Sequence, residues 1–296
     1  MGVTTHPKLV EPLIKQLQSL GAVVSLGDSP AGKTLAKDVC KYNGLEAVCK
    51  EYNVPIVNLN TPVTITANNR AIKVAKELDD FDKIINLPKL KTHMICTMTL
   101  GVKNMYGVVP NLAKSSYHKM FPNYDDFSKL IIDLCTAVKP TLTILDGIIG
   151  MEGHGPSNGT PRNFNILAAS SDPFCLDKEI TKIAGVDKLV PTVYQHQTEK
   201  YQVVGDKVEI DNIKLPVVNA KKISSMLPRF LKKHFEPKPK PYHHNCIGCK
   251  KCHEICPVDA ITMVHKRPII DYKKCIRCFS CHEVCPVDAI HVKFWK

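Results

Sequence analysis

Short apolar runs alternate with longer amphipathic segments through the first 235 residues. The apolar runs are typical of buried strands: AVVSL (22–26), VPIVNLN (54–60), DKIINL (82–87), TLTILD (141–146) and FNILAAS (164–170). Segments 7–21, 125–138 and 172–185 have apolar residues at helical spacing instead. The alternation predicts an α/β domain with a mainly parallel sheet flanked by helices. Ligands of such sheets gather at the carboxyl ends of the strands.

The pattern changes after residue 235. Lysine and proline alternate in KKHFEPKPKPYHH (232–244), and proline disfavours both helix and strand, so we expect 236–244 to be an extended linker. The cysteine-rich remainder, 245–296, is too short to bury a sufficient core alone. We therefore divide the chain into an α/β domain (1–235), this linker and a small α+β domain.

Eight of the thirteen cysteines form an internal repeat. CIGCKKCHEICPVDAI starts at Cys246 and CIRCFSCHEVCPVDAI starts at Cys275, so equivalent residues lie 29 positions apart (275 − 246). Each copy is the C-x₂-C-x₂-C-x₃-C-P run of two-cluster bacterial ferredoxins, whose fourth cysteine ligates the other cluster. Paired CxxC motifs also bind zinc, but three cysteines per run and the Cys-Pro favour two [4Fe–4S] clusters.

This pattern assigns the eight thiolates to two crossed sets. We expect cluster I on Cys246, Cys249, Cys252 and Cys285, and cluster II on Cys275, Cys278, Cys281 and Cys256.

Net charge and hydropathy limit the partners and the cell compartment expected for this protein. The formal net charge of +12 favours an acidic partner or a small anionic substrate, and no groove-binding motif accompanies it, so we expect no nucleic-acid partner. No apolar run reaches the ~18 residues of a membrane span, and MGVTTHPK lacks the features of a signal peptide. Crowded cysteines outside an oxidising compartment suggest metal. We expect a cytoplasmic protein without membrane contact.

Two groups of cationic and polar residues follow the third apolar run, DKIINL. In NLPKLKTH (86–93) the alternation of extended chain would point Lys89, Lys91 and His93 to one side, where they could bind a carboxylate or phosphate. Lys103 and Asn104 lie between two glycines in TLGVKNMYGVVP, and His118 follows. The alternative for each group is an ordinary surface or packing role.

A third group follows TLTILD. We expect a strand to end at Asp146 and a glycine-rich loop to surround Glu152, an arrangement suited to a metal or an anion. The alternative is a merely tight connection. Asp172 is better explained as the N-cap of a helix that starts at Pro173.

The segment GDSPAGKT, Gly27–Thr34, fits the phosphate-binding pattern G-x-x-x-x-G-K-[ST]. Pro30 removes one backbone N–H from the loop, and Asp28 would bring a carboxylate toward the phosphates. In favour of the pattern, Asp146 could hold magnesium at the end of a second strand. A P-loop ATPase with a ferredoxin tail therefore stays open as an alternative.

Motifs along almost the whole chain resemble the prokaryotic family called domain of unknown function 362 (DUF362). They are GVTTHP at Gly2, GDSP at Gly27, INLPKLKTH at Ile85, VKNMYGVVP at Val102 and DGIIGMEGHGP at Asp146. The resemblance implies an iron–sulfur protein of the cytoplasm, often from an anaerobe, whose amino-terminal chemistry is not defined. Family members generally carry a strand of the type VLIKPN before GVTTHP, so we expect this domain to lack its first strand or the chain to start short.

We therefore expect an iron–sulfur oxidoreductase that moves electrons through two [4Fe–4S] clusters to or from the amino-terminal domain. We expect an anion or a cofactor to be bound by Lys89, Lys103, Asn104, Asp146 and Glu152. We expect catalysis to be carried out by His93, His118 and Lys91. A redox partner protein is expected. The alternatives are a non-enzymatic electron carrier, whose large domain only docks a partner, and the P-loop ATPase.

Overall fold

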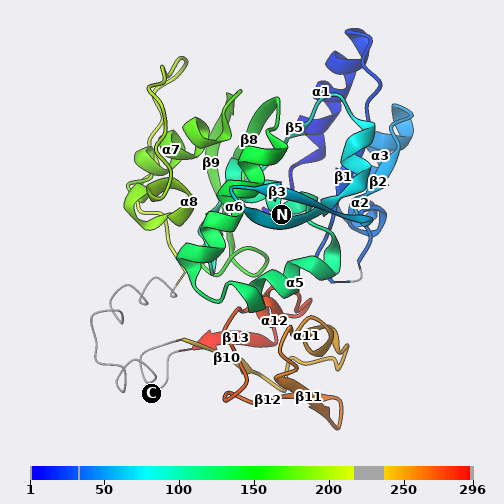
Figure 1. Ribbon diagram of the computed structural model, residues 1–296, viewed down its shortest axis with the longest axis vertical. Helices are drawn as coiled ribbons and strands as arrows, with labels where there is room; N and C mark the ends of the chain where they lie inside the picture. The colour runs from blue at the N-terminus through cyan, green and yellow to red at the C-terminus, as the bar shows by residue number, and fades with distance from the viewer. Residues whose placement is uncertain (1, 33, 217–236, 294–296) are drawn as a thin grey trace.

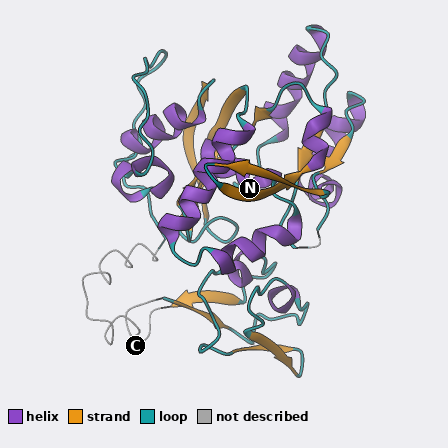
Figure 2. Ribbon diagram, in the orientation of Figure 1, coloured by secondary structure: helices purple, strands orange, loops and turns teal. Residues whose placement is uncertain are grey.

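The computed structural model describes residues 2–32, 34–216 and 237–293. Figure 1 shows two parts: a larger one from the amino terminus, and below it the cysteine-rich module, coloured orange to red. Figure 2 shows helices on both sides of the strands in the larger part. Its α-helices are α1 (Pro7–Ser19), α2 (Ala36–Asn43), α3 (Leu45–Glu51), α4 (Gly101–Asn104), α5 (Asn111–Met120), α6 (Tyr124–Val138), α7 (Pro173–Ile183) and α8 (Pro191–Tyr194). Short 3₁₀ turns cover Lys76–Asp80, Met105–Val108 and Asp187–Leu189.

The central sheet is built around one long strand, β8 (Leu142–Glu152). Along one edge it pairs in parallel first with β5 (Ile85–Asn86) and then with β6 (Lys89–His93). Along the other edge it pairs antiparallel with β9 (Thr160–Ser170), and β7 (Thr97–Thr99) adds antiparallel to β6. The predicted α/β class is confirmed, and the sheet is mixed.

Two smaller sheets flank the central one. Strands β1 (Leu26–Asp28) and β2 (Ile56–Asn58) pair in parallel, each shorter than its apolar run. Strands β3 (Pro62–Ala67) and β4 (Arg70–Ala75) form an antiparallel hairpin through Asn68 and Asn69, which both have positive φ.

The expectation that a strand ends at Asp146 is wrong, because β8 continues to Glu152. The glycines that suggested a loop instead let the backbone pass close to its neighbours. A Cβ on Gly150 would lie 2.4 Å from the carbonyl oxygen of Leu90 on β6. The β6–β8 register also shifts between Lys89 and Lys91, where the extra β8 residues are accommodated as a bulge.

Two apolar cores hold α6 and α7 on the sheets. Helix α6 places Phe127, Leu130 and Leu134 in the core shared with the β3–β4 hairpin. Helix α7 packs Leu176 and Ile180 into a second core under β6, β8 and β9.

The helix starts follow from local sequence. Asp172 accepts a hydrogen bond from the Phe174 backbone N–H, so its predicted role as the N-cap of α7 is confirmed. Asn123 caps α6 in the same way. Helix α1 continues through Pro12, which lies near its first turn.

The cysteine-rich module repeats one unit. Each half supplies a short helix and a strand: α11 (Lys251–Glu254) with β11 (Ile261–Val264), and α12 (Ser280–Glu283) with β13 (Ile290–Lys293). In each half a histidine Nδ1 contacts the carbonyl oxygen eight residues later, His253 to Ile261 at 2.6 Å and His282 to Ile290 at 2.5 Å. Strand β12 (Arg267–Ile270) pairs with β11.

Part of the expected linker is a strand. β10 (Lys238–Pro241) pairs antiparallel with β13, so proline does not exclude strand here. The physical reason is that β10 is an edge strand, where alternate residues need no ladder N–H. Residues 232–236 lie outside the described residues.

In the part of the chain that the structure describes, none of the helices combines the length and apolarity needed to cross a bilayer.

A buried ion pair lies in the middle of the central sheet. Lys89 Nζ lies 2.6 Å from Asp146 Oδ2, and both side chains are almost fully buried. The same carboxylate accepts hydrogen bonds from the backbone N–H groups of His6 and Ile148. Asp146 thereby connects β6, β8 and the amino-terminal segment.

Replacing Lys89 with Met should lower the free energy of unfolding by about 3–5 kcal/mol, because it leaves the Asp146 carboxylate buried and uncompensated. Urea titration followed by far-ultraviolet circular dichroism at equal iron content measures the change. Lys83 is exposed on the same segment, so Lys83→Met should stay within about 0.5 kcal/mol of wild type. Equal stabilities of the two variants would contradict the role given to this pair.

Candidate functional site

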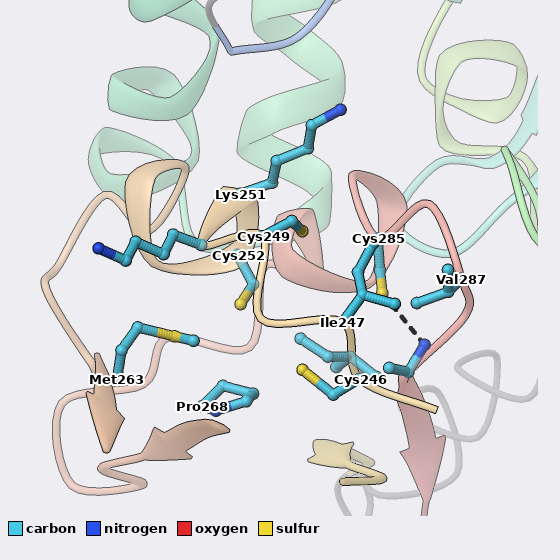
Figure 3. Close-up of a pocket in the computed structure, with 12 residues that line it drawn as sticks. Cys246, Ile247, Cys249, Lys251, Cys252, Met263, Pro268, Cys285 and Val287 are labelled. Carbon is cyan, nitrogen blue, oxygen red and sulfur yellow. Dashed lines mark hydrogen bonds between the residues drawn. The ribbon is translucent and has the colours of Figure 1, made fainter. Parts of the chain in front are cut away.

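The eight repeat cysteines surround two separate cavities. Figure 3 shows the first, with Cys246 and Cys249 approaching from one loop, Cys252 from α11 and Cys285 from the opposite side. The second is lined by the cysteines of the other set, Cys275, Cys278, Cys281 and Cys256. This is the crossed grouping that the sequence predicts. Four thiolates around each cavity fit a four-iron cluster.

Burial makes these thiols poor acids until metal binds. It raises the pKa of Cys252 and of Cys278 to about 11, and that of Cys281 further. Iron takes thiolates, so metal binding must displace these protons. The module buries only a small core, Cys252, Ile261, Ile270, Cys281 and Ile290, in which two of the five residues are proposed ligands. Cluster binding and folding of the module are therefore coupled.

The second cysteine loop, residues 275–285 with α12, is packed against the amino-terminal domain. Phe279 is 1% exposed and packs with Met94, which belongs to the turn between β6 and β7. Cys278 packs on the core that holds α6. The Asn158 side chain donates a hydrogen bond to the carbonyl oxygen of His282. In Figure 1, α12 accordingly lies directly beneath α5.

His93 lies at this contact with one defined tautomer. Its Nδ1 accepts hydrogen bonds from the backbone N–H groups of Ile95 (3.1 Å) and Cys96 (3.2 Å). A neutral ring must then carry its proton on Nε2, which lies 3.6 Å from Glu283 Oε1 on α12. Burial lowers the pKa of His93 well below its usual value, so the neutral form dominates.

Three lysines face the same region. Burial and the charge of Lys103 lower the pKa of Lys91 to about 8, and Lys91 Nζ donates to the carbonyl oxygen of Val3 at 2.8 Å. Burial likewise lowers the pKa of Lys114, on α5, to about 8. Lys103 Nζ sits 4.8 Å from the centre of the Tyr106 ring. We call Lys91, Lys103 and Lys114 the lysine site.

Two carboxylates from distant segments face the lysine site. Asp28, at the carboxyl end of β1, raises the pKa of Lys91 and of Lys114. Glu283 comes from the cysteine-rich module, and burial raises its pKa to about 7 against the opposing charges of the lysines. When His93 and His118 are neutral, the three ammonium groups of the lysine site face only the two carboxylates of Asp28 and Glu283. Such a site favours binding of a further anion.

His118 is close to this group but is held in an aromatic environment. Its ring stacks on Phe127 at 4.5 Å and meets Tyr106 edge-on at 6.4 Å. Burial lowers its pKa to about 3. A protonated His118 is therefore unstable near neutral pH, and packing explains its position.

Four of the other expected site residues are engaged elsewhere. Lys89 and Asp146 pair with each other, which leaves neither free for a substrate or for magnesium. The Glu152 carboxylate accepts from Arg162 at 2.9 Å, and this contact lowers its pKa. Glu152 stands six positions after Asp146 on the same strand, roughly 20 Å away, so a metal shared between them is excluded. Asn104 donates its amide to Asn86 at 2.8 Å.

The GDSP segment serves the lysine site rather than forming an open phosphate loop. The Ser29 N–H donates to its neighbour Asp28, and the first amide of α2, on Ala36, donates to Asn58. These contacts use N–H groups that a phosphate would need. Lys33, the lysine of the P-loop pattern, lies outside the described residues.

The sequence did not single out Lys114, Glu283 or the part played by Asp28. Lys114 could have been found, because it stands four residues before His118 on one helix face. Glu283 could not, since the equivalent Glu254 of the first repeat is exposed. Only the docking of α12 distinguishes these two glutamates.

The α/β domain and the cysteine-rich module agree with the results of sequence comparison. Residues 1–182 match the family described as Domain of unknown function (DUF362), and the chain belongs to that family. Residues 245–290 match the 4Fe-4S dicluster domain, so the chain carries an iron–sulfur domain with the capacity for electron transfer.

The chain is also similar to the thylakoid-associated protein sll1697 of Synechocystis sp. The two are 34% identical over 246 residues, which cover 78% of this chain and 76% of that protein.

Anion binding at the lysine site should weaken as the pH rises. Lys91 and Lys114 are charged below about pH 8 and neutral above it, so an anion loses its partners through that range. Sulfate does not titrate there, and isothermal titration should show its affinity falling at least about tenfold between pH 7 and 9.5.

The Lys91→Met/Lys114→Met variant provides the control, since it should bind sulfate weakly at both pH values. An affinity that is equal at pH 7 and 9.5 in the wild type would rule out the lysine site as the anion-binding group.

Proposed function

We propose that the protein is an iron–sulfur oxidoreductase. The two crossed cysteine sets would hold two [4Fe–4S] clusters, which would supply or accept the electrons for a redox reaction of a small anion bound at the lysine site. The observation that carries this proposal is the packing of the second cysteine loop on the amino-terminal domain, with Glu283 of that loop 3.6 Å from His93.

The position of the loop supports electron exchange over a short path. Cys278 packs on a core that also contains Cys96 and Tyr106, and Tyr106 lies under Lys103. When bound, the clusters supply one-electron chemistry that the amino acids at the lysine site lack. The protein then contributes binding, orientation and charge.

The lysine site selects and orients the anion. Lys91 and Lys103 come from strand β6 and helix α4, both fixed by the central sheet, and Lys114 comes from α5. Their charges stabilise added negative charge on a bound molecule when an electron arrives. A small carboxylate or oxyanion fits three ammonium groups at this site.

His93 and Glu283 complete the arrangement from the two sides of the domain contact. The Nε2–H of His93 points toward the Glu283 carboxylate, while its Nδ1 is occupied by backbone amides. His93 is therefore oriented to hand the Nε2 proton to a bound group, and the Glu283 carboxylate lies 3.6 Å from the same nitrogen. His118 takes no part in this proposal.

The crossed cluster ligation is tested with matched cysteine variants. Cys285→Ala and Cys249→Ala should leave the same remaining electron paramagnetic resonance spectrum, because both belong to the first set. Cys256→Ala and Cys278→Ala should leave the complementary spectrum. Native mass spectrometry of the anaerobic wild type should show the mass of two four-iron clusters. A Cys285→Ala spectrum that matches Cys278→Ala would show uncrossed ligation.

The redox role is tested by reoxidation of the photoreduced protein with a panel of small carboxylates and oxyanions. Bleaching near 400 nm should reverse with at least one of them, and Lys91→Met/Lys103→Met should slow the reversal at least about tenfold while keeping the oxidised spectrum. Lys83→Met is the matched control and should react like wild type.

Reoxidation at equal rates in the double variant would remove the lysine site from the reaction. A wild type that reacts only with oxidised electron-transfer proteins would support the carrier function instead.

A further inference from the structure

The two cysteine loops of the module have the same sequence pattern but opposite surroundings. In the second loop, Phe279 is 1% exposed and covered by the amino-terminal domain. The first loop has no such cover in the described structure: Ile247 is 64% exposed and Cys249 is exposed as well. Ile247, Cys249 and Lys250 of the first loop therefore face solvent, whereas Phe279 of the second loop faces the amino-terminal domain.

The chemistry of the first loop differs from that of the second at one matched position. Position 250 is equivalent to position 279 by the 29-residue repeat, and there the exposed loop carries a lysine where the docked loop carries phenylalanine. Lys266 packs along the same loop, since a Cβ on Gly248 would lie 2.9 Å from the Lys266 Cβ. The Arg267 guanidinium donates to the Cys246 carbonyl oxygen.

Among the described residues that line the first cavity, two are lysines and none is acidic. Ile247 is an exposed apolar side chain in the same loop as the exposed Cys249, and the exposed Lys250 is next to that cysteine in the chain. An apolar centre with a charged rim is the usual anatomy of a protein interface.

We propose that Ile247, Cys249, Lys250 and Lys266 form a docking surface for an electron-transfer protein with an acidic face. This inference rests on the proposed function, because it supplies the entry or exit point for the electrons that the second loop exchanges with the lysine site. The internal contact serves as the precedent, since the equivalent loop already docks on a protein surface. Phe279 of the second loop packs on an apolar surface, whereas Lys250 and Lys266 of the first loop require an acidic partner surface.

The transfer itself is one electron between two proteins. With a cluster bound, a reduced [2Fe–2S] ferredoxin would lose one electron and become oxidised while that cluster would be reduced by one electron; the reverse would hold when this chain is the reductant. Charge complementarity acts mainly on the association rate and is screened by salt.

Stopped-flow mixing of the full-length anaerobic protein with an acidic plant-type [2Fe–2S] ferredoxin tests the surface. Electron transfer is followed in its thermodynamically favourable direction. The wild-type rate constant should fall as salt rises. Lys250→Glu/Lys266→Glu should lower it at least about tenfold at low salt and remove the salt dependence. The rate constant of the Lys250→Gln/Lys266→Gln variant should lie between those of the wild type and of the Lys250→Glu/Lys266→Glu variant.

Two controls separate docking from other effects. Lys200→Glu/Lys207→Glu makes the same change in net charge on exposed residues of the amino-terminal domain and should react like wild type. Reduction by the neutral deazaflavin radical should be equal in all variants, which shows intact, accessible clusters.

The proposal is overturned if the two double Glu variants slow equally, if the wild type shows no salt dependence, or if a basic redox protein reacts faster than the acidic one. These measurements follow only the clusters. Failure of the lysine site to turn over an anion would leave them unchanged, so the two proposals fail separately.

Discussion

The packing of the second cysteine loop on the turn between β6 and β7 is the contact on which the functional arrangement depends. That turn holds His93 through its own backbone amides, and the loop brings Glu283 to the opposite side of the same ring. Neither domain contains the complete group of residues. The central sheet sets the turn, since β6 is fixed to β8 by the buried pair of Lys89 and Asp146.

Much of this architecture is predictable from sequence because it is local. The cysteine spacing gives the cluster module and its crossed grouping, and the cap at Asp172 gives the start of α7. The alternation in NLPKLKTH correctly separates Leu90, which enters the core, from Lys91. Each of these signals lies within a few residues of the feature that it specifies.

The errors arise where distant segments meet. Gly147 and Gly150 are typical of a loop, yet they continue β8 because the neighbouring strands β6 and β9 pass too close for side chains. Asp146 and Glu152 look like free ligands until Lys89 and Arg162 are placed beside them. Proline in 238–241 is compatible with strand only because β10 is an edge. Burial and pairing across the fold decide these cases, and no local pattern contains them.

The grouping of Cys285 with the first loop has a consequence for biosynthesis. A ribosome releases the ligands in chain order, so three cysteines of the first cavity emerge early and wait for the fourth until both loops are made. The first cavity therefore has its complete set of four ligands only after the second loop has been synthesised, which makes the two loops depend on each other for cluster assembly.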